Sequence, residues 1–110
     1  MSPQHKNLTL EKWNRLSFIE QMANIGSEVE RALNWRARHH AAYCQLAFER
    51  ALELLDLTLE SVKGFSRLKE LTRLREAMAD YFFGTNRFQY NEASLKQYFL
   101  NFAYAARRNR

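Results

Sequence analysis

Apolar residues recur every three or four positions along most of the chain, which is the spacing that places them on one face of an α-helix. The first long segment with this pattern begins after Ser17 and contains Phe18, Met22, Ile25, Val29 and Leu33. Ser17 is followed three residues later by Glu20, the spacing of a capping box, in which each side chain accepts a hydrogen bond from the other residue's backbone. We therefore predict a helix that begins at Ser17 and ends around residues 38–40.

The end of this helix is predicted from length, because no Gly or Pro stands at residues 38–40. Without a break there, one helix over residues 17–61 would measure about 68 Å, since each residue adds about 1.5 Å. That is too long for a compact domain of this size. Gly26 lies inside the helix beside its apolar face, so either close backbone approach by a neighbour or simple tolerance explains it, and we expect close packing.

The next predicted helix, about residues 41–61, is apolar around most of its circumference and therefore needs more than one neighbour. Its polar positions form an acidic stripe at steps of three and four: Glu49, Glu53, Asp56 and Glu60. We expect this stripe to face solvent or to pair with basic residues of the following helix or of a neighbouring subunit. Gly64 is predicted to end the helix with a left-handed cap.

Two further helices are predicted, over residues 66–83 and from Asn91, as N-cap, to about residue 107. Their inward residues are Leu68, Leu71, Leu74, Met78 and Phe82 in the first, and Leu95, Tyr98, Phe99, Phe102 and Ala106 in the second. Gly84 is expected to end the first. A short helical turn over about residues 9–16, pinned by Trp13, precedes them all.

Short connections make neighbouring helices antiparallel, so the predicted fold is all-α: an antiparallel up-down-up-down four-helix bundle with a short N-terminal helical turn. We expect residues 1–16 to be a partly ordered leader and residues 17–110 to form a single helical-bundle domain. The composition agrees, because three Gly and one Pro are too few for the turns of an all-β fold.

The chain has neither an N-terminal secretory signal nor an apolar stretch long enough to cross a membrane, so we expect a soluble, cytoplasmic protein. Cys44 is the only cysteine, which excludes an internal disulfide. A free thiol suits a reducing compartment.

No catalytic motif, Walker loop or glycine-rich phosphate loop is present, so we expect no enzyme activity and no cofactor. His40 and Cys44 lie four residues apart, but two ligands do not make a zinc site, so no metal is expected. The paired Glu-x-x-His motifs of di-iron bundles are also missing.

A net charge of +5 favours polyanionic partners. Basic residues gather in three segments, and we predict nucleic-acid contacts there at Arg31, Arg36, Arg38, Arg67, Lys69, Arg73, Arg75, Arg107 and Arg108. Nine of the 15 aromatic residues lie in the last 30 positions, more than one core can bury. We predict that some form an interface, namely Phe83, Phe88, Tyr90, Tyr98 and Tyr104.

Four segments together carry a resemblance: IGSEVERALNWR, LAFERALELLDLT, RLKELTRLREAMADYF and FAYAARRN. They look like a group of short prokaryotic helical proteins of unassigned function, over about residues 13–107. The predicted architecture is also similar, at the level of fold alone, to ribosomal S23-like proteins and retroelement accessory proteins, which form rings and contact RNA.

HEPN-class ribonucleases also resemble this architecture, but they carry Arg, four to six residues, then His. Here Arg36 precedes His39 by two intervening residues and His40 by three, so that activity is not expected.

The leading functional hypothesis is a non-enzymatic, self-associating helical module that mediates protein–protein interaction. A homo-oligomer is expected and a membrane partner is not. The alternative is an RNA- or DNA-binding accessory protein that uses the basic clusters. An enzyme of unrecognised type is the third and least favoured hypothesis.

Overall fold

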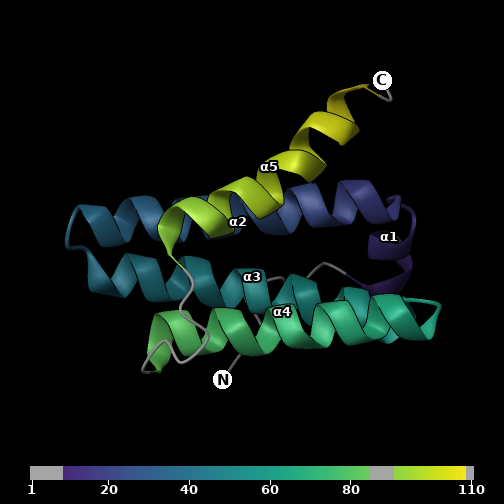
Figure 1. Ribbon diagram of the computed structural model, residues 1–110, viewed down its shortest axis with the longest axis horizontal. Coiled ribbons are helices and arrows are strands. Elements are labelled where there is room, and N and C mark those ends of the chain that lie inside the picture. Colours follow the sequence, from purple (N-terminus) through teal and green to yellow (C-terminus); the bar gives the residue numbers. More distant parts are fainter. Residues whose placement is uncertain (1–8, 85–90, 109–110) are drawn as a thin grey trace.

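The computed structural model describes residues 9–84 and 91–108, and all the regular structure within them is helical. Five helices follow in chain order: α1 (Leu10–Asn14), α2 (Phe18–Ala37), α3 (Ala41–Ser61), α4 (Phe65–Phe83) and α5 (Glu92–Arg108). In Figure 1, α2, α3 and α4 lie alongside one another, and α5 crosses α2 obliquely. The all-helical class and the early helical turn are therefore as predicted.

Helix α2 is covered on two sides, by α3 and by α5. It begins with the predicted capping box, in which the Glu20 backbone N–H donates to Ser17 Oγ and the Ser17 N–H donates to Glu20 Oε1. Its apolar face is buried in the main core, where Met22, Ile25, Val29 and Leu33 pack with residues of α3, α4 and α5. The helix therefore forms the centre of the fold.

The predicted break between α2 and α3 is present, and His39 supplies what a glycine usually does. His39 has a φ of 60°, in the left-handed region that histidine visits more often than most residues. Its N–H donates to Arg36 O at 3.1 Å, and the His40 N–H donates to Trp35 O at 3.0 Å. This pair of bonds is a Schellman motif, and the contact between the Trp35 and His40 rings, with centroids 5.3 Å apart, completes it.

Helix α5 approaches α2 at Gly26, as expected for a glycine beside an apolar face. A Cβ at Gly26 would lie 2.7 Å from Phe99 Cβ, closer than two carbon atoms can pack. Asn91 caps α5 as predicted, because its Oδ1 accepts from the Ser94 N–H at 2.7 Å. The close crossing buries Phe99 and Leu95 at the start of α5.

Helix α3 also holds α1 and α4. The buried Trp13 of α1 donates from its indole Nε1 to Thr58 Oγ1 at 2.9 Å. On the α4 side, the rings of Phe48 and Phe82 lie 4.3 Å apart. Within the acidic stripe of α3, Asp56 pairs with α4 as expected, because Arg75 Nε donates to Asp56 Oδ1 at 2.7 Å.

Two predictions about the start of α4 are wrong. Gly64 has a φ of 96° and a ψ of 132°, so it is not a left-handed helix cap, and it precedes α4 while Val62 caps α3. Leu68, predicted to face inward, is 42% exposed. Both differences have one cause: α4 begins a residue early, at Phe65, and its first turns lie outside the main core.

Candidate binding surface on helix α4

The first six residues of α4 are all exposed. Phe65 has 80% of its surface exposed, and the first buried residue of α4 is Leu71. The main neighbour of α4 is α3, and the buried side chains of α4 point towards it and the core. An exposed phenylalanine on a rigid helix is unusual, because fully burying such a side chain is worth about 1.5–3 kcal/mol.

Phe65 belongs to a row of outward residues spaced three or four apart. We call this row the α4 face; it consists of Phe65, Leu68, Thr72, Glu76, Ala79 and Phe83. Phe83, at the far end, is 58% exposed. The spacing is that of a helix seam that packs against a second helix, with apolar residues at both ends and polar ones in the middle.

A groove beside the α4 face separates α4 from α5. This α4–α5 groove has a volume of about 510 Å³, and its walls include Phe65, Lys69, Glu70, Arg73, Leu95 and Tyr98. Tyr98 Oη donates to Glu70 Oε1 at 2.7 Å and bridges the two helices. The groove therefore brings together three of the predicted site residues, the cations Lys69 and Arg73 and the ring of Tyr98.

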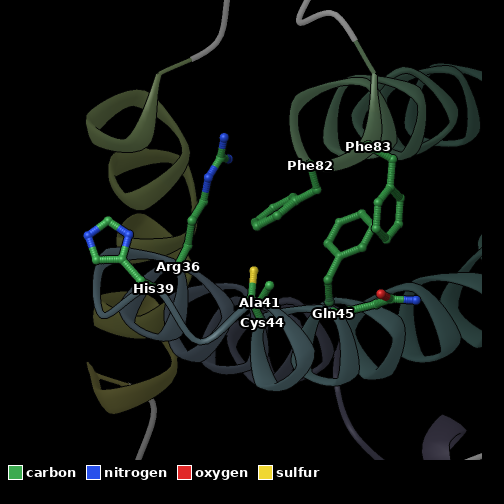
Figure 2. Close-up of a pocket in the computed structure, with 8 residues that line it drawn as sticks. Arg36, His39, Ala41, Cys44, Gln45, Phe82 and Phe83 are labelled. Carbon is green, nitrogen blue, oxygen red and sulfur yellow. The ribbon is translucent and has the colours of Figure 1, made fainter.

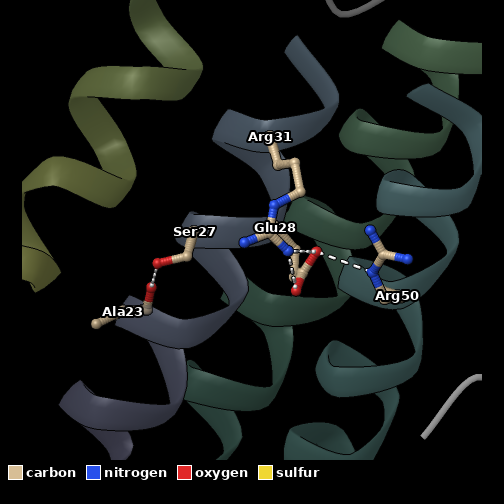
Figure 3. Close-up of polar contacts among 5 residues, drawn as sticks. All are labelled: Ala23, Ser27, Glu28, Arg31 and Arg50. Atoms are coloured by element: carbon tan, nitrogen blue, oxygen red, sulfur yellow. Dashed lines mark hydrogen bonds and ion pairs between the residues drawn. The ribbon is translucent and has the colours of Figure 1, made fainter. Parts of the chain in front are cut away.

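Two other predicted nucleic-acid contacts are held by carboxylates. Figure 3 shows Glu28 of α2 between Arg31 and Arg50, with N–O distances of 3.0 and 3.1 Å. Arg75 forms two hydrogen bonds with Asp56, which raise the pKa of its guanidinium above the ordinary value. The Arg31 pair lies within α2, whereas Arg50 joins α3 to α2 and Arg75 joins α4 to α3.

Four more predicted contacts lie over aromatic rings. Arg36 Cζ lies 4.8 Å from the centroid of the Tyr81 ring, and Arg38 Cζ lies 5.7 Å from that of Trp35. Arg67 Cζ lies 3.9 Å from the centroid of the Phe18 ring, and Arg107 Cζ lies 6.0 Å from that of Tyr104. Such cation–π contacts hold a guanidinium in place while leaving its edge free to donate. Arg108 is exposed at the end of α5.

The predicted basic clusters lie at opposite ends of the molecule. Arg36 and Arg38 lie at the α2–α3 turn, whereas Arg67 and Lys69 lie near the α3–α4 turn, which Figure 1 shows at the other end. A single surface built from both clusters is therefore not present.

The predicted interface aromatics are only partly brought together. Phe83 lies on the α4 face, Tyr98 in the α4–α5 groove, and the exposed Tyr104 on α5. Phe88 and Tyr90 lie outside the described residues. Sequence analysis missed Phe65, although a signal was available: Phe65 stands three residues before Leu68 and extends the same helical row.

Within residues 9–84 and 91–108, no three His, Cys, Asp or Glu side chains are placed to hold a metal ion. Burial raises the pKa of the Cys44 thiol, and the nearby charge of Arg36 offsets part of that rise. No helix in the described part of the chain is long and apolar enough to cross a membrane.

Comparison of the chain with protein-family models, with curated proteins and with solved structures finds no match. The resemblance of its segments to short prokaryotic helical proteins, and the fold-level analogies, stay predictions.

Proposed function

We propose that the protein is a non-catalytic helical module that self-associates through the α4 face to form a two-fold dimer. In this proposal the four long helices act as an antiparallel up-down-up-down bundle, and α4 supplies the contact between bundles. The observation that carries the proposal is the exposed row on α4, with Phe65 80% and Phe83 58% exposed at its two ends. Large apolar side chains in a helical row mark a surface that packs against another helix.

The row is suited to pairing with a second copy of itself. In an antiparallel pair of α4 helices centred near Leu74, Phe65 of each copy lies opposite Phe83 of the partner subunit. Thr72 then lies opposite Glu76 of the partner subunit, near the two-fold axis. A two-fold interface needs such a self-complementary surface, because the same residues meet in both directions.

The charges beside the row fit the same arrangement. Lys69 and Arg73 of α4 are exposed next to the row, and Glu76 is exposed within it. Antiparallel pairing brings Lys69 and Arg73 of each copy within reach of Glu76 of the partner subunit. Parallel pairing instead places like charges side by side, and like charges in register disfavour pairing.

Light scattering over a range of protein concentrations tests the proposal. The unaltered protein should have the mass of a dimer, and Phe65→Glu should raise the dissociation constant about 30-fold or more, because it places a charge at the end of the apolar row. Tyr104→Glu is the control, since Tyr104 is also an exposed aromatic residue but lies on α5, outside the α4 face. It should leave the dimer intact.

A monomer at every concentration would overturn the proposal. So would equal weakening by Phe65→Glu and Tyr104→Glu, because the α4 face would then have no special role. Both substitutions are at exposed positions, so the fold should survive them; helical circular dichroism checks this.

A second function, binding of single-stranded nucleic acid, is favoured by the α4–α5 groove. Lys69 and Arg73 stand there with Tyr98 and Phe65, and cations beside aromatic rings are how many proteins bind a single strand. Binding to a short RNA should weaken as salt rises, and Lys69→Gln with Arg73→Gln should weaken it further. Retention of no RNA at low salt would exclude this function and leave the dimer untouched.

The proposal places the protein in the cytoplasm, where the single Cys44 would stay reduced.

A further inference from the structure

A pocket lies at the end of the molecule where the α2–α3 turn meets the last turn of α4. It has a volume of about 430 Å³, within the range of small-molecule sites. Three helices contribute to it: Arg36 from α2, Cys44, Gln45 and Phe48 from α3, and Phe82 and Phe83 from α4. None of these residues is part of the α4–α5 groove, and Phe83 alone is shared with the α4 face.

The inner wall of the pocket is aromatic. Phe48 is fully buried, and its ring lies 4.3 Å from that of Phe82 and 4.9 Å from that of Phe83. Figure 2 shows the Phe82 ring projecting across the space towards the Cys44 side chain. Flat ligands with an aromatic ring suit such a wall, because offset and edge contacts between rings are favourable.

Arg36 places a positive charge at the rim of the pocket. The Arg36 side chain rises beside the opening (Figure 2), and its Cζ lies 4.8 Å from the Tyr81 ring and 5.9 Å from the Phe82 ring. Among the described residues that line the pocket there is no Asp or Glu. A guanidinium held against rings, beside an apolar wall without a carboxylate, is suited to an anion that the ligand brings.

The fold holds Arg36 in this place. Arg36 is in the last turn of α2, and its carbonyl accepts the His39 N–H at 3.1 Å in the Schellman motif that ends the helix. The left-handed His39 turns the chain so that α3 starts beneath the guanidinium. Charge and aromatic wall are therefore positioned by the same turn.

We infer that this pocket binds a small aromatic carboxylate, with the carboxylate on Arg36 and the ring against Phe82, which the buried Phe48 supports from behind. The planar guanidinium can donate two parallel hydrogen bonds to a carboxylate. This site goes beyond the proposed dimer, and it does not depend on it.

Phenylacetate is the test ligand, and benzyl alcohol is its uncharged counterpart of similar shape. Heteronuclear NMR titration of the full chain should shift the signals of Cys44, Phe82 and their neighbours with phenylacetate, and only weakly with benzyl alcohol. Arg36→Gln should weaken phenylacetate binding about tenfold or more, because it removes a hydrogen-bonded charge pair. Arg38→Gln is the matched control, because Arg38 lies over Trp35 and does not line the pocket.

A second variant and a second readout guard against a folding effect. Ala41→Leu fills the pocket from the first turn of α3 and keeps Arg36, so it should also weaken binding. Bound phenylacetate should slow alkylation of Cys44, and Arg36→Gln should remove that protection.

Equal binding of benzyl alcohol and phenylacetate would overturn the inference, as would equal losses in Arg36→Gln and Arg38→Gln. Absence of any shift at the pocket would do the same. Light scattering on Arg36→Gln separates the two proposals, because this variant should dimerise normally.

Discussion

Helices α2 and α4 have nearly the same length, 20 and 19 residues, but very different surroundings. Helix α2 has seven buried residues and lies between α3 and α5, whereas α4 has four and packs mainly on α3. Both have an apolar residue at every third or fourth position. The difference lies in how many helical neighbours the chain itself provides.

This comparison shows why an apolar row on α4 is informative. On α2 the side chains of the apolar row are buried in the core, and their burial contributes to stability. On α4 a second row has large apolar side chains that stay exposed, with Phe65 80%, Leu68 42% and Phe83 58% exposed. Such exposed apolar side chains do not contribute to the core, and the proposed dimer would bury them.

The largest expected effect is a difference between the two apolar rows. Ile25 is fully buried on α2, and Ile25→Ala should lower the free energy of unfolding by about 2–5 kcal/mol. Leu68→Ala on α4 removes a side chain of the same size and should change the stability of the monomer by less than about 0.5 kcal/mol. Urea denaturation of dilute protein measures both. Similar losses would mean that α4 is as firmly packed as α2.

The next effect concerns the closest approach in the fold. Gly26→Ala raises helix propensity by about 1 kcal/mol, but its Cβ would lie 2.7 Å from Phe99 Cβ. Because Phe99 Cβ is fixed to the backbone of α5, the two helices must separate, and we expect a net loss of about 1–2 kcal/mol. Ser27→Ala, one position away and exposed, is the control. A gain in thermal stability for Gly26→Ala would refute the close crossing.

A smaller difference in stability is expected between variants of the two ion pairs that join helices. Glu28 links α2 to α3, and its side chain is 15% exposed, whereas Asp56 links α3 to α4 and is 49% exposed. Glu28→Gln should cost about 1 kcal/mol, because it removes the negative charge from a pair that is mostly buried. Asp56→Asn should cost less than about 0.5 kcal/mol. Thermal melts at low and high salt measure both, and the reverse order would contradict the comparison.

The smallest expected effect is on the alkylation rate of Cys44, which reports on how well α4 covers this part of α3. Burial raises the pKa of this thiol. At a pH below that pKa, the folded protein therefore has a smaller thiolate fraction at Cys44 than the unfolded chain. Iodoacetamide should therefore react more slowly with folded protein than with protein in urea at pH 8, and the ratio should shrink as pH rises. Equal rates at pH 8 would mean that α4 leaves Cys44 open.

The parts of the fold that local rules control were predictable from the sequence. The capping box at Ser17, the cap at Asn91 and the close contact at Gly26 each follow from one residue type in one pattern. The start of α4 was not predictable in this way, because Gly64 can begin a helix as well as end one. The left-handed His39 was not predictable either, because histidine adopts that conformation more often than most residues but still only in a small minority of cases.

The residue types of the candidate surfaces were predictable from the sequence, but their positions on the folded molecule were not. Composition indicated surplus aromatic and basic residues, and helical spacing showed which of them share a face of one helix. Spacing could not show that Arg31 meets Arg50 at Glu28 or that Arg36 lies over Tyr81, because these contacts join different helices. Only the packing of helices separates the basic clusters to opposite ends.

The distance between spin labels on the two copies of α4 tests the central proposal most directly. With Cys44→Ser as background, labels are attached at Ser66→Cys or Thr72→Cys, both exposed positions. In the antiparallel dimer the two Ser66 positions lie about 24 Å apart along the helix axis and the two Thr72 positions about 6 Å apart. Pulsed electron paramagnetic resonance should therefore find the label pair at 66 farther apart than the pair at 72 by about 10 Å or more. Equal distances at both positions, or no coupling between labels at either, would contradict the account.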